Sequence, residues 1–230
     1  MYQQAVLSEF RVPTRVGDSR ILRNREDLRR ALTRVLDIVL SLVLLAVLAP
    51  FLLLTAIGVY LTNPGPVFFG HMRLGMNGQQ FRCWKFRSMV VDADQRLAEL
   101  LATDPEARRE WELDHKLRND PRITKVGALL RKSSIDELPQ LYNVLKGEMS
   151  LVGPRPIVLS EVERYRRYYA QYCSHRPGIT GLWQISGRND VSYRRRVALD
   201  VMYCRRKSVR FNLMILALTV PRVVFARGSY

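Results

Sequence analysis

A run of 24 residues without a charged side chain, Ile38 to Leu61, constrains this chain more than any other feature. A helix needs about 20 apolar residues to cross the hydrocarbon core of a bilayer. The alternative is a buried core helix of a soluble protein, but such helices are rarely apolar on every face over this length. A cleaved secretory signal fits poorly, because no small-residue cleavage site follows the run. The sequence therefore predicts a helix that enters a membrane.

Pro50 lies near the middle of this run and bears on the path of the helix. A proline inside a helix removes one hydrogen bond and clashes with the preceding turn, so we expect a sharp kink. Residues 35–49 would form only about 22 Å of helix, against a hydrocarbon core of ~30 Å. Basic flanks favour the cytoplasmic side, and they lie before the run and after it. Re-entry on one face and a straight crossing both stay open here, since membrane helices tolerate proline.

The charge balance of the chain points to anionic partners. Lys and Arg total 37 and Asp and Glu total 21, giving a formal net charge of +16. Nucleic acid, a phospholipid surface or phosphorylated small molecules would suit such a surplus, but the sequence shows no nucleic-acid-binding motif. The three cysteines and three histidines are scattered, which argues against a disulfide framework or a zinc site.

Two adjacent acids, Asp136 and Glu137, lie in the stretch SSIDELPQL within this basic chain. The pattern fits a helix start, because Ser134 and Glu137 have the spacing of a capping box and Pro139 suits an early helical position. The surroundings indicate chemistry instead, since basic residues lie on both sides. Paired carboxylates can hold a divalent cation, and one carboxylate can attack phosphorus. From the residues alone, both interpretations stay open.

Two further stretches could contact phosphate. In VGPRPI, two prolines bracket Arg155 and would fix its guanidinium for bidentate contact with phosphate oxygens. RPGITGLWQISGRND combines three glycines with Arg176, Arg188 and Asn189, and such glycines let backbone amides approach an anion. It is neither a P-loop nor a dinucleotide fingerprint. A surface turn is the alternative for the first stretch.

The remaining pattern predicts a mostly helical α+β domain with a small β-hairpin. The hairpin is expected over 67–73 and 81–89, with a turn at GMNGQ. Helices are expected over 92–118 with an interruption at Pro105, and over 157–172, 193–209 and 211–225.

Four motifs occur together and in order: RVLDIVLSLVLLAVLAPF, NPGPVFFGHMRLGMNGQQFRCWKFRSM, NDPRITKVGALLRKSSIDELPQLYNVLKGEMSLVGPRPI and RPGITGLWQISGRND with RRVALDVMY shortly after it. On these the chain resembles the bacterial sugar transferases of the monotopic phosphoglycosyl transferase superfamily, over nearly all of residues 33–230. The TGLWQISGRND block and the C-terminal RGSY resemble the undecaprenyl-phosphate galactose phosphotransferase branch of exopolysaccharide synthesis.

The resemblance implies a two-step reaction with Mg²⁺. Asp136 would attack the β-phosphate of a UDP-sugar and release UMP, and polyprenyl (undecaprenyl) phosphate would then accept the phosphosugar. Glu137 would assist in metal binding or deprotonation of the acceptor. The resemblance also assigns substrate-binding positions, which are Lys85, Arg87, Arg131, Arg155, Arg176, Arg188, Asn189 and Asp200.

The resemblance further implies an organisation at the bacterial inner membrane. We expect a basic arm over 1–32, a re-entrant membrane helix broken at Pro50 over 33–62, and a catalytic domain on the cytoplasmic face over 63–230, with amphipathic helices on the phospholipid surface. Nucleic acid is not expected as a partner, and the sequence leaves a homo-oligomer open. A non-catalytic membrane scaffold is the alternative function, and it predicts that Asp136→Asn has no effect.

Overall fold

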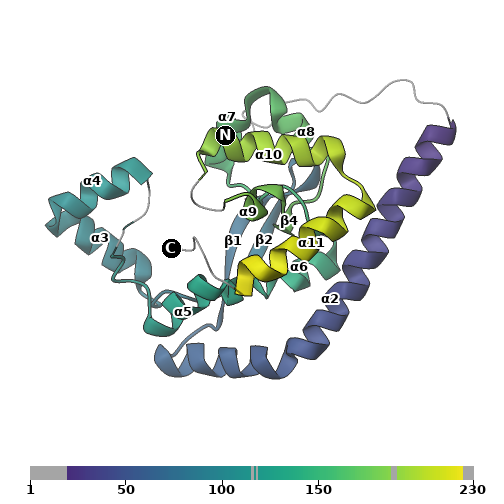
Figure 1. Ribbon diagram of the computed structural model, residues 1–230. Coiled ribbons are helices and arrows are strands. Elements are labelled where there is room, and N and C mark those ends of the chain that lie inside the picture. Colours follow the sequence, from purple (N-terminus) through teal and green to yellow (C-terminus); the bar gives the residue numbers. More distant parts are fainter. Residues whose placement is uncertain (1–19, 115–116, 118, 188–190, 225–230) are drawn as a thin grey trace.

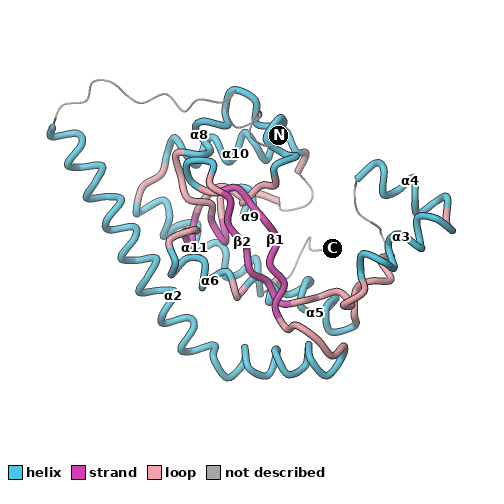
Figure 2. Tube along the Cα trace, turned by 180° about the vertical axis from the view of Figure 1, so that it is seen from behind, coloured by secondary structure: helices cyan, strands magenta, loops and turns pink. Residues whose placement is uncertain are grey.

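The computed structural model describes residues 20–114, 117, 119–187 and 191–224. Its fold is mostly helical, with two small sheets between the helices (Figures 1 and 2). The helices are α2 (Arg20–Thr62), α3 (Ala93–Thr103), α4 (Pro105–Asp114), α5 (Lys125–Ser133), α6 (Gln140–Lys146), α7 (Val162–Tyr165), α8 (Tyr169–Cys173), α9 (Leu182–Ile185), α10 (Tyr193–Arg206) and α11 (Val209–Val224). The strands are β1 (Phe68–Leu74), β2 (Gln80–Phe86), β3 (Ser150–Val152) and β4 (Gly178–Thr180).

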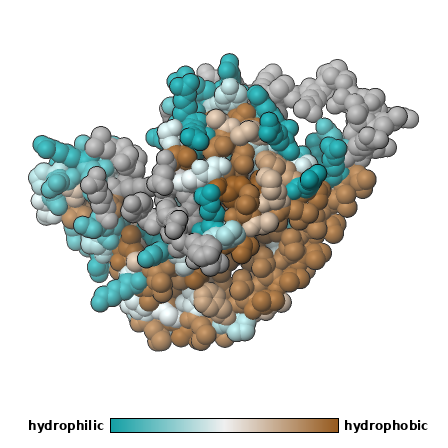
Figure 3. Space-filling view, in the orientation of Figure 1, coloured by the Kyte–Doolittle hydropathy of each residue, from teal (hydrophilic) through white to brown (hydrophobic). Residues whose placement is uncertain are grey.

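The apolar run forms most of α2. Within the described residues, one helix is long and apolar enough to cross a membrane, and it spans Glu26–Thr62. Its apolar side chains are largely uncovered by the rest of the protein, as the hydrophobic edge along α2 in Figure 3 shows. An apolar surface of this size indicates a membrane or partner contact. The prediction of a membrane-associated helix is therefore supported.

The path of α2 differs from the predicted helix-break-helix. Helical structure continues through Pro50, so the chain forms one helix of 43 residues rather than two. Figure 1 shows this helix changing direction sharply along its length, as a kink at Pro50 would cause, because proline costs one backbone hydrogen bond and does not have to end the helix. The helix begins at Arg20, inside the segment predicted as a basic arm.

The two parts of α2 pack on different parts of the domain. Leu40 and Leu45 pack against the core formed by β2, α6, β3, α10 and α11. Leu52, Ala56 and Val59 pack against Phe86 and Leu130 instead. Asp37 fixes the first part, since it accepts hydrogen bonds from Ser150 Oγ (2.7 Å) and the Leu151 amide (3.0 Å).

The predicted hairpin is confirmed. β1 and β2 pair antiparallel, with Phe69 opposite Lys85 and His71 opposite Cys83. The turn between them lies where the sequence predicts it, and Asn77 and Gly78 both have positive φ there. β3 and β4 form a separate parallel pair.

The predicted helices over 92–118, 193–209 and 211–225 correspond to α3 with α4, α10 and α11, and Pro105 begins α4 as expected. The single helix predicted over 157–172 is wrong. Two 3₁₀ turns interrupt it, and at one of them Arg166 takes a φ of 48°. Tyr165, Tyr169 and Tyr172 have the spacing of one helix face and still lie in one buried cluster, so the break is a local one in the backbone at Arg166.

Candidate active site

Asp136 and Glu137 lie on a 3₁₀ turn, Ile135–Glu137, between α5 and α6. Helix α5 ends at Ser134, whose φ of 59° is left-handed and whose amide donates to the carbonyls of Leu130 and Arg131. The predicted capping box is therefore wrong. Ser134 closes the preceding helix, and its side chain makes no cap hydrogen bond to the next turn. The tight reversal instead exposes the two neighbouring carboxyl groups to one cavity.

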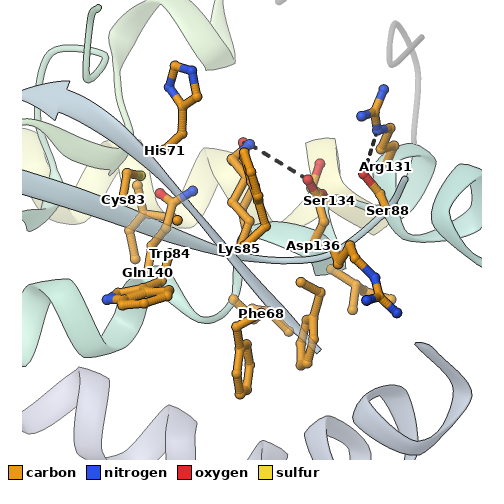
Figure 4. A pocket seen from close by; sticks show the side chains of 18 of the residues that line it. Phe68, His71, Cys83, Trp84, Lys85, Ser88, Arg131, Ser134, Asp136 and Gln140 are labelled. Atoms are coloured by element: carbon orange, nitrogen blue, oxygen red, sulfur yellow. Dashed lines mark hydrogen bonds and ion pairs between the residues drawn. The ribbon is translucent and has the colours of Figure 1, made fainter. Parts of the chain in front are cut away.

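Lys85 joins the acid pair from the opposite side. It comes from β2, and its Nζ lies 2.6 Å from Glu137 Oε1 and 3.6 Å from Asp136 Oδ2. Figure 4 shows Lys85 pointing from the strand toward Asp136, with Ser88 and Arg131 beyond. The hairpin therefore brings a cation between two acids that are more than 50 residues away in sequence.

The two carboxyl groups have opposite ionisation tendencies. Burial raises the pKa of Asp136 to about 6, and the neighbouring Lys85 ammonium offsets part of that effect. Burial acts in the same sense on Glu137, but there Lys85, Arg155 and Arg73 outweigh it and hold the pKa below its ordinary value. Glu137 therefore ionises at a lower pH than Asp136, and Asp136 becomes an available nucleophile as the pH rises above 6.

Basic and polar side chains from several elements surround the pair in an open cavity of about 1090 Å³. Arg131 donates from Nε to Ser88 Oγ (2.8 Å) and lies close enough to lower the pKa of Asp136. The cavity also reaches α2 and the start of β1, where its wall is apolar. The residues that line it and bear on its chemistry are Leu48, Phe51, Phe68, Arg73, Lys85, Ser88, Arg131, Asp136, Glu137, Arg155, Thr180 and Trp183.

The proline-bracketed Arg155 lines this cavity. Its guanidinium lies over the ring of Trp183, 5.4 Å from the centroid. Arg196 lies over the same ring at 5.0 Å. Asp200 is buried behind this group and does not line the cavity. Asp200 accepts a hydrogen bond from the Tyr165 hydroxyl (2.7 Å) and interacts with the Arg155 backbone amide.

The predicted residues thus separate into two groups. Lys85, Arg131 and Arg155 converge on the acid pair. Arg87 lines the cavity, but its guanidinium donates to the Asn63 carbonyl and so also fixes the end of α2. Arg176 does not line the cavity, and its Nε donates to the Gly147 carbonyl (2.7 Å) at the end of α6. Arg188 and Asn189 lie outside the described residues.

Two further residues of the site, Arg73 and Trp183, are not indicated by any pattern in the sequence. Arg73 lies on β1, which places it beside the cavity, and it contributes to the low pKa of Glu137. Because the side chains of a strand alternate between its two faces, Arg73 is expected on the same face as the residues two positions before and after it. Nothing in the sequence indicates that this face meets the acid pair. Trp183 has the pattern of an ordinary core residue.

The residues present are compatible with a divalent cation that also binds the substrate. Among the residues that the structure describes, no group of three or more His, Cys, Asp or Glu side chains could hold a metal ion. Asp136 and Glu137 supply two carboxylates. Magnesium is commonly bound by one or two carboxylates together with substrate phosphates and water, so this donor set fits only with phosphate present.

Residues 28–226 match the protein family described as bacterial sugar transferase. The chain belongs to the bacterial sugar transferase family. This family assignment confirms the resemblance based on the four motifs.

Several curated members of this sugar transferase family are similar to the chain. The exopolysaccharide production protein ExoY of Rhizobium meliloti is 50% identical over 86% of this chain and 87% of its own length. The undecaprenyl-phosphate galactose phosphotransferase of Salmonella typhimurium is 50% identical, over 87% of this chain and 42% of its own length. The UDP-glucose:undecaprenyl-phosphate glucose-1-phosphate transferase of Escherichia coli is 39% identical, again over 42% of its length. The chain therefore spans less than half of the longer relatives.

Proposed function

We propose that this chain transfers a sugar 1-phosphate from a UDP-sugar to polyprenyl phosphate and releases UMP. The product would be a polyprenyl-diphospho-sugar, which begins the assembly of an exopolysaccharide or O-antigen-type glycan. The observation that carries the proposal is the acid pair, held by Lys85 in a cavity that has basic walls and opens toward an apolar helix. One soluble anionic substrate and one lipid-linked phosphate could meet there.

In the first step, an Asp136 carboxylate oxygen attacks the phosphorus that carries the sugar. The bond from this phosphorus to the bridging oxygen breaks, UMP leaves with the electron pair, and a phosphosugar stays on Asp136. Arg131 and Arg155 would stabilise charge on the transferring phosphoryl group, because both line the cavity around the acid pair. Lys85 would keep Asp136 ionised and oriented.

In the second step, a phosphate oxygen of the lipid attacks the same phosphorus and regenerates the Asp136 carboxylate. The apolar part of the cavity wall, formed by Leu48, Phe51 and Phe68, suits the lipid end of this acceptor. Glu137 carries a negative charge beside the reacting group, so it can receive a proton from the acceptor phosphate or help to bind a cation.

Mg²⁺ is part of the proposal. Asp136 and Glu137 would hold it together with the diphosphate of the donor. When bound, the ion would neutralise charge on the diphosphate and favour departure of UMP.

The membrane arrangement also belongs to the proposal. We infer that α2 enters and leaves on the cytoplasmic face of the bacterial inner membrane. The bend in α2 (Figure 1) and the basic residues on both sides of the apolar run support this path. Cysteine labelling at residues 26 and 78 should report the same side of the membrane, and labelling from opposite sides would contradict re-entry.

The donor sugar is proposed from the relatives. The relative named for galactose transfer is more similar to this chain than the relative named for glucose transfer, so UDP-galactose is the first candidate and UDP-glucose the second. The test is UMP release from each UDP-sugar in the presence of undecaprenyl phosphate. Asp136→Asn should abolish release, and Glu112→Gln, which also removes one carboxylate but lies exposed on α4 outside the cavity, is the matched control. Release by Asp136→Asn at the parent rate would refute the proposed mechanism.

A further inference from the structure

Helices α3 and α4 form an acidic hairpin in a strongly basic protein. Residues 92–114, here called the acidic hairpin, contain eight acidic and three basic side chains, so their net charge is −5 although the whole chain carries +16. Figures 1 and 2 show this hairpin projecting from the body of the protein. Among the side chains of this hairpin that the structure describes, Ala107 is the only one that is buried. The hairpin therefore presents most of its charge to the surroundings.

A basic groove lies elsewhere on the same molecule, between the α7–α8 segment and α10. It is an open cavity of about 1510 Å³, and Glu163 is the one acidic residue that lines it within the described part of the chain. Its exposed arginines are Arg164, Arg166, Arg167, Arg194, Arg205 and Arg206. None of these six forms an ion pair with a described acidic residue.

The basic groove combines these charges with aromatic rings held in place. Arg164 lies 4.6 Å from the centroid of Tyr193, and Arg167 lies 5.0 Å from that of Tyr168. Arginine and tyrosine are the residues that most often dominate the binding energy of protein interfaces. Arg166, between them, has a backbone φ of 48°, an uncommon conformation that is often found at functional sites. The surface has the composition of a protein-binding site for an acidic partner.

We propose that two copies of this chain associate by placing the acidic hairpin of one copy in the basic groove of the other. The opposite net charges of the two surfaces favour this pairing over a partner of another class, because complementary potentials steer association and disfavour wrong partners. In a closed pair, each hairpin meets the groove of the other copy only if a two-fold axis relates the two copies. This is the commonest symmetry of protein oligomers. The proposal is independent of the transferase reaction, since neither surface contains the acid pair.

Reversal of the charges on each surface gives a direct test. The oligomeric state of the full chain in detergent micelles is measured by sedimentation at about 50 mM and about 500 mM salt. Charge screening is weak at the lower concentration and strong at the higher one. The groove variant is Arg167→Glu with Arg194→Glu, and the hairpin variant is Glu99→Arg with Glu112→Arg. Lys125→Glu with Arg210→Glu is the control, because it changes the net charge as the groove variant does but alters neither surface. A circular dichroism spectrum and a thermal unfolding midpoint equal to those of the parent would show that each variant is folded.

The parent chain should be dimeric at low salt and dissociate at high salt. Each reversed variant alone should have a dimer dissociation constant raised about tenfold or more, whereas the control should match the parent. An equal mixture of the groove and hairpin variants should dimerise again. In the mixed pair, the acidic groove of one variant meets the basic hairpin of the other, and the two unchanged surfaces also meet. A chain that carries both reversals should also dimerise.

A parent chain that is monomeric at low salt would overturn the proposal. So would variants that dimerise as the parent does, or a mixture that stays monomeric. The groove variant should keep its binding to phosphatidylglycerol vesicles. If it loses that binding while its oligomeric state is unchanged, the groove contacts anionic lipid and the proposal is wrong.

Discussion

Removal of the Lys85 ammonium should move the pH dependence of the first half-reaction. In the structure, Lys85 Nζ lies 3.6 Å from Asp136 Oδ2. At an effective dielectric constant of about 20, two unit charges at that distance attract by roughly 4–5 kcal/mol. Observed shifts from one such neighbour are about 1–3 pKa units, and each unit corresponds to about 1.4 kcal/mol. Because Lys85→Met also raises the pKa of Glu137, and so weakens its repulsion of Asp136, we expect a shift of about one to two units.

The direction follows from the charge that is lost. A positive neighbour favours the Asp136 carboxylate, so its removal raises the pKa of Asp136 above the present value of about 6. Activity requires the carboxylate, and the rising limb of the pH profile should therefore shift to higher pH. Near neutral pH, Lys85→Met should lose about twofold to tenfold in rate from this effect alone, because the ionised fraction of Asp136 falls by that factor.

The assay is kcat/KM for the UDP-sugar, measured by UMP release between about pH 5 and 9. In a two-step mechanism this quantity reports the free enzyme and the first half-reaction. The acceptor phosphate, which as a monoester itself ionises near pH 6, then does not contribute. Lys85→Arg should keep the parent midpoint. Arg82→Met removes a charge from the same strand, but Arg82 is not one of the groups that contact the acid pair. This variant should therefore also keep the midpoint of the parent pH profile. If Lys85→Met reduces activity but leaves the midpoint of the pH profile unchanged, the Lys85 ammonium does not set the pKa of Asp136.

Three other substitutions test the supporting structure. Asp37→Ala should lower the free energy of unfolding by about 1.5–3 kcal/mol, because it removes a charged acceptor of two hydrogen bonds. Thermal unfolding of the purified chain measures this change. An unchanged unfolding midpoint would contradict the role of Asp37 in holding α2. Asp200→Ala should reduce kcat/KM roughly tenfold to a hundredfold by loosening the Arg155 loop, while Asp200→Asn should keep most activity; a loss in Asp200→Asn equal to that of Asp136→Asn would instead indicate contact with substrate. Gly127→Ala should destabilise the fold by about 1–3 kcal/mol or more, since the added carbon would lie 1.9 Å from the Ser88 carbonyl oxygen; stability equal to the parent in denaturant titration would show that α5 can move away.

The sequence predicts the parts of this fold that depend on local pattern. The apolar run, the hairpin around Asn77 and the interruption at Pro105 each rest on residue types with strong local preferences, and each corresponds to an element of the structure. The segment 157–172 has a helical pattern as well, but the backbone at Arg166 takes a positive φ and interrupts the helix, which no residue type in the segment predicts. The route of the chain through Pro50 likewise depends on how the two parts of α2 pack, which local preference does not determine.

The candidate site is predictable to a similar extent. Adjacent acids in a basic sequence indicate chemistry, and the family motifs point to the same pair. The partner Lys85 is brought to the pair by the fold of the hairpin. Residue type alone does not separate Arg155, which enters the cavity, from Arg176, which binds a backbone carbonyl. The same limit applies to Asp200, whose carboxyl group is buried behind the cavity and accepts a hydrogen bond from the Tyr165 hydroxyl.

The most direct test of the account uses the purified chain, UDP-galactose and Mg²⁺ without a lipid acceptor, followed by intact-protein and peptide mass spectrometry. If Asp136 is the nucleophile, we expect a burst of about one UMP per chain and the added mass of one phosphohexose on the peptide that contains Asp136. Addition of undecaprenyl phosphate should remove this mass, and Asp136→Asn should show neither burst nor adduct. UMP release only when the lipid is present, with no adduct, or an adduct on a different residue, would contradict the central claim that Asp136 is the nucleophile.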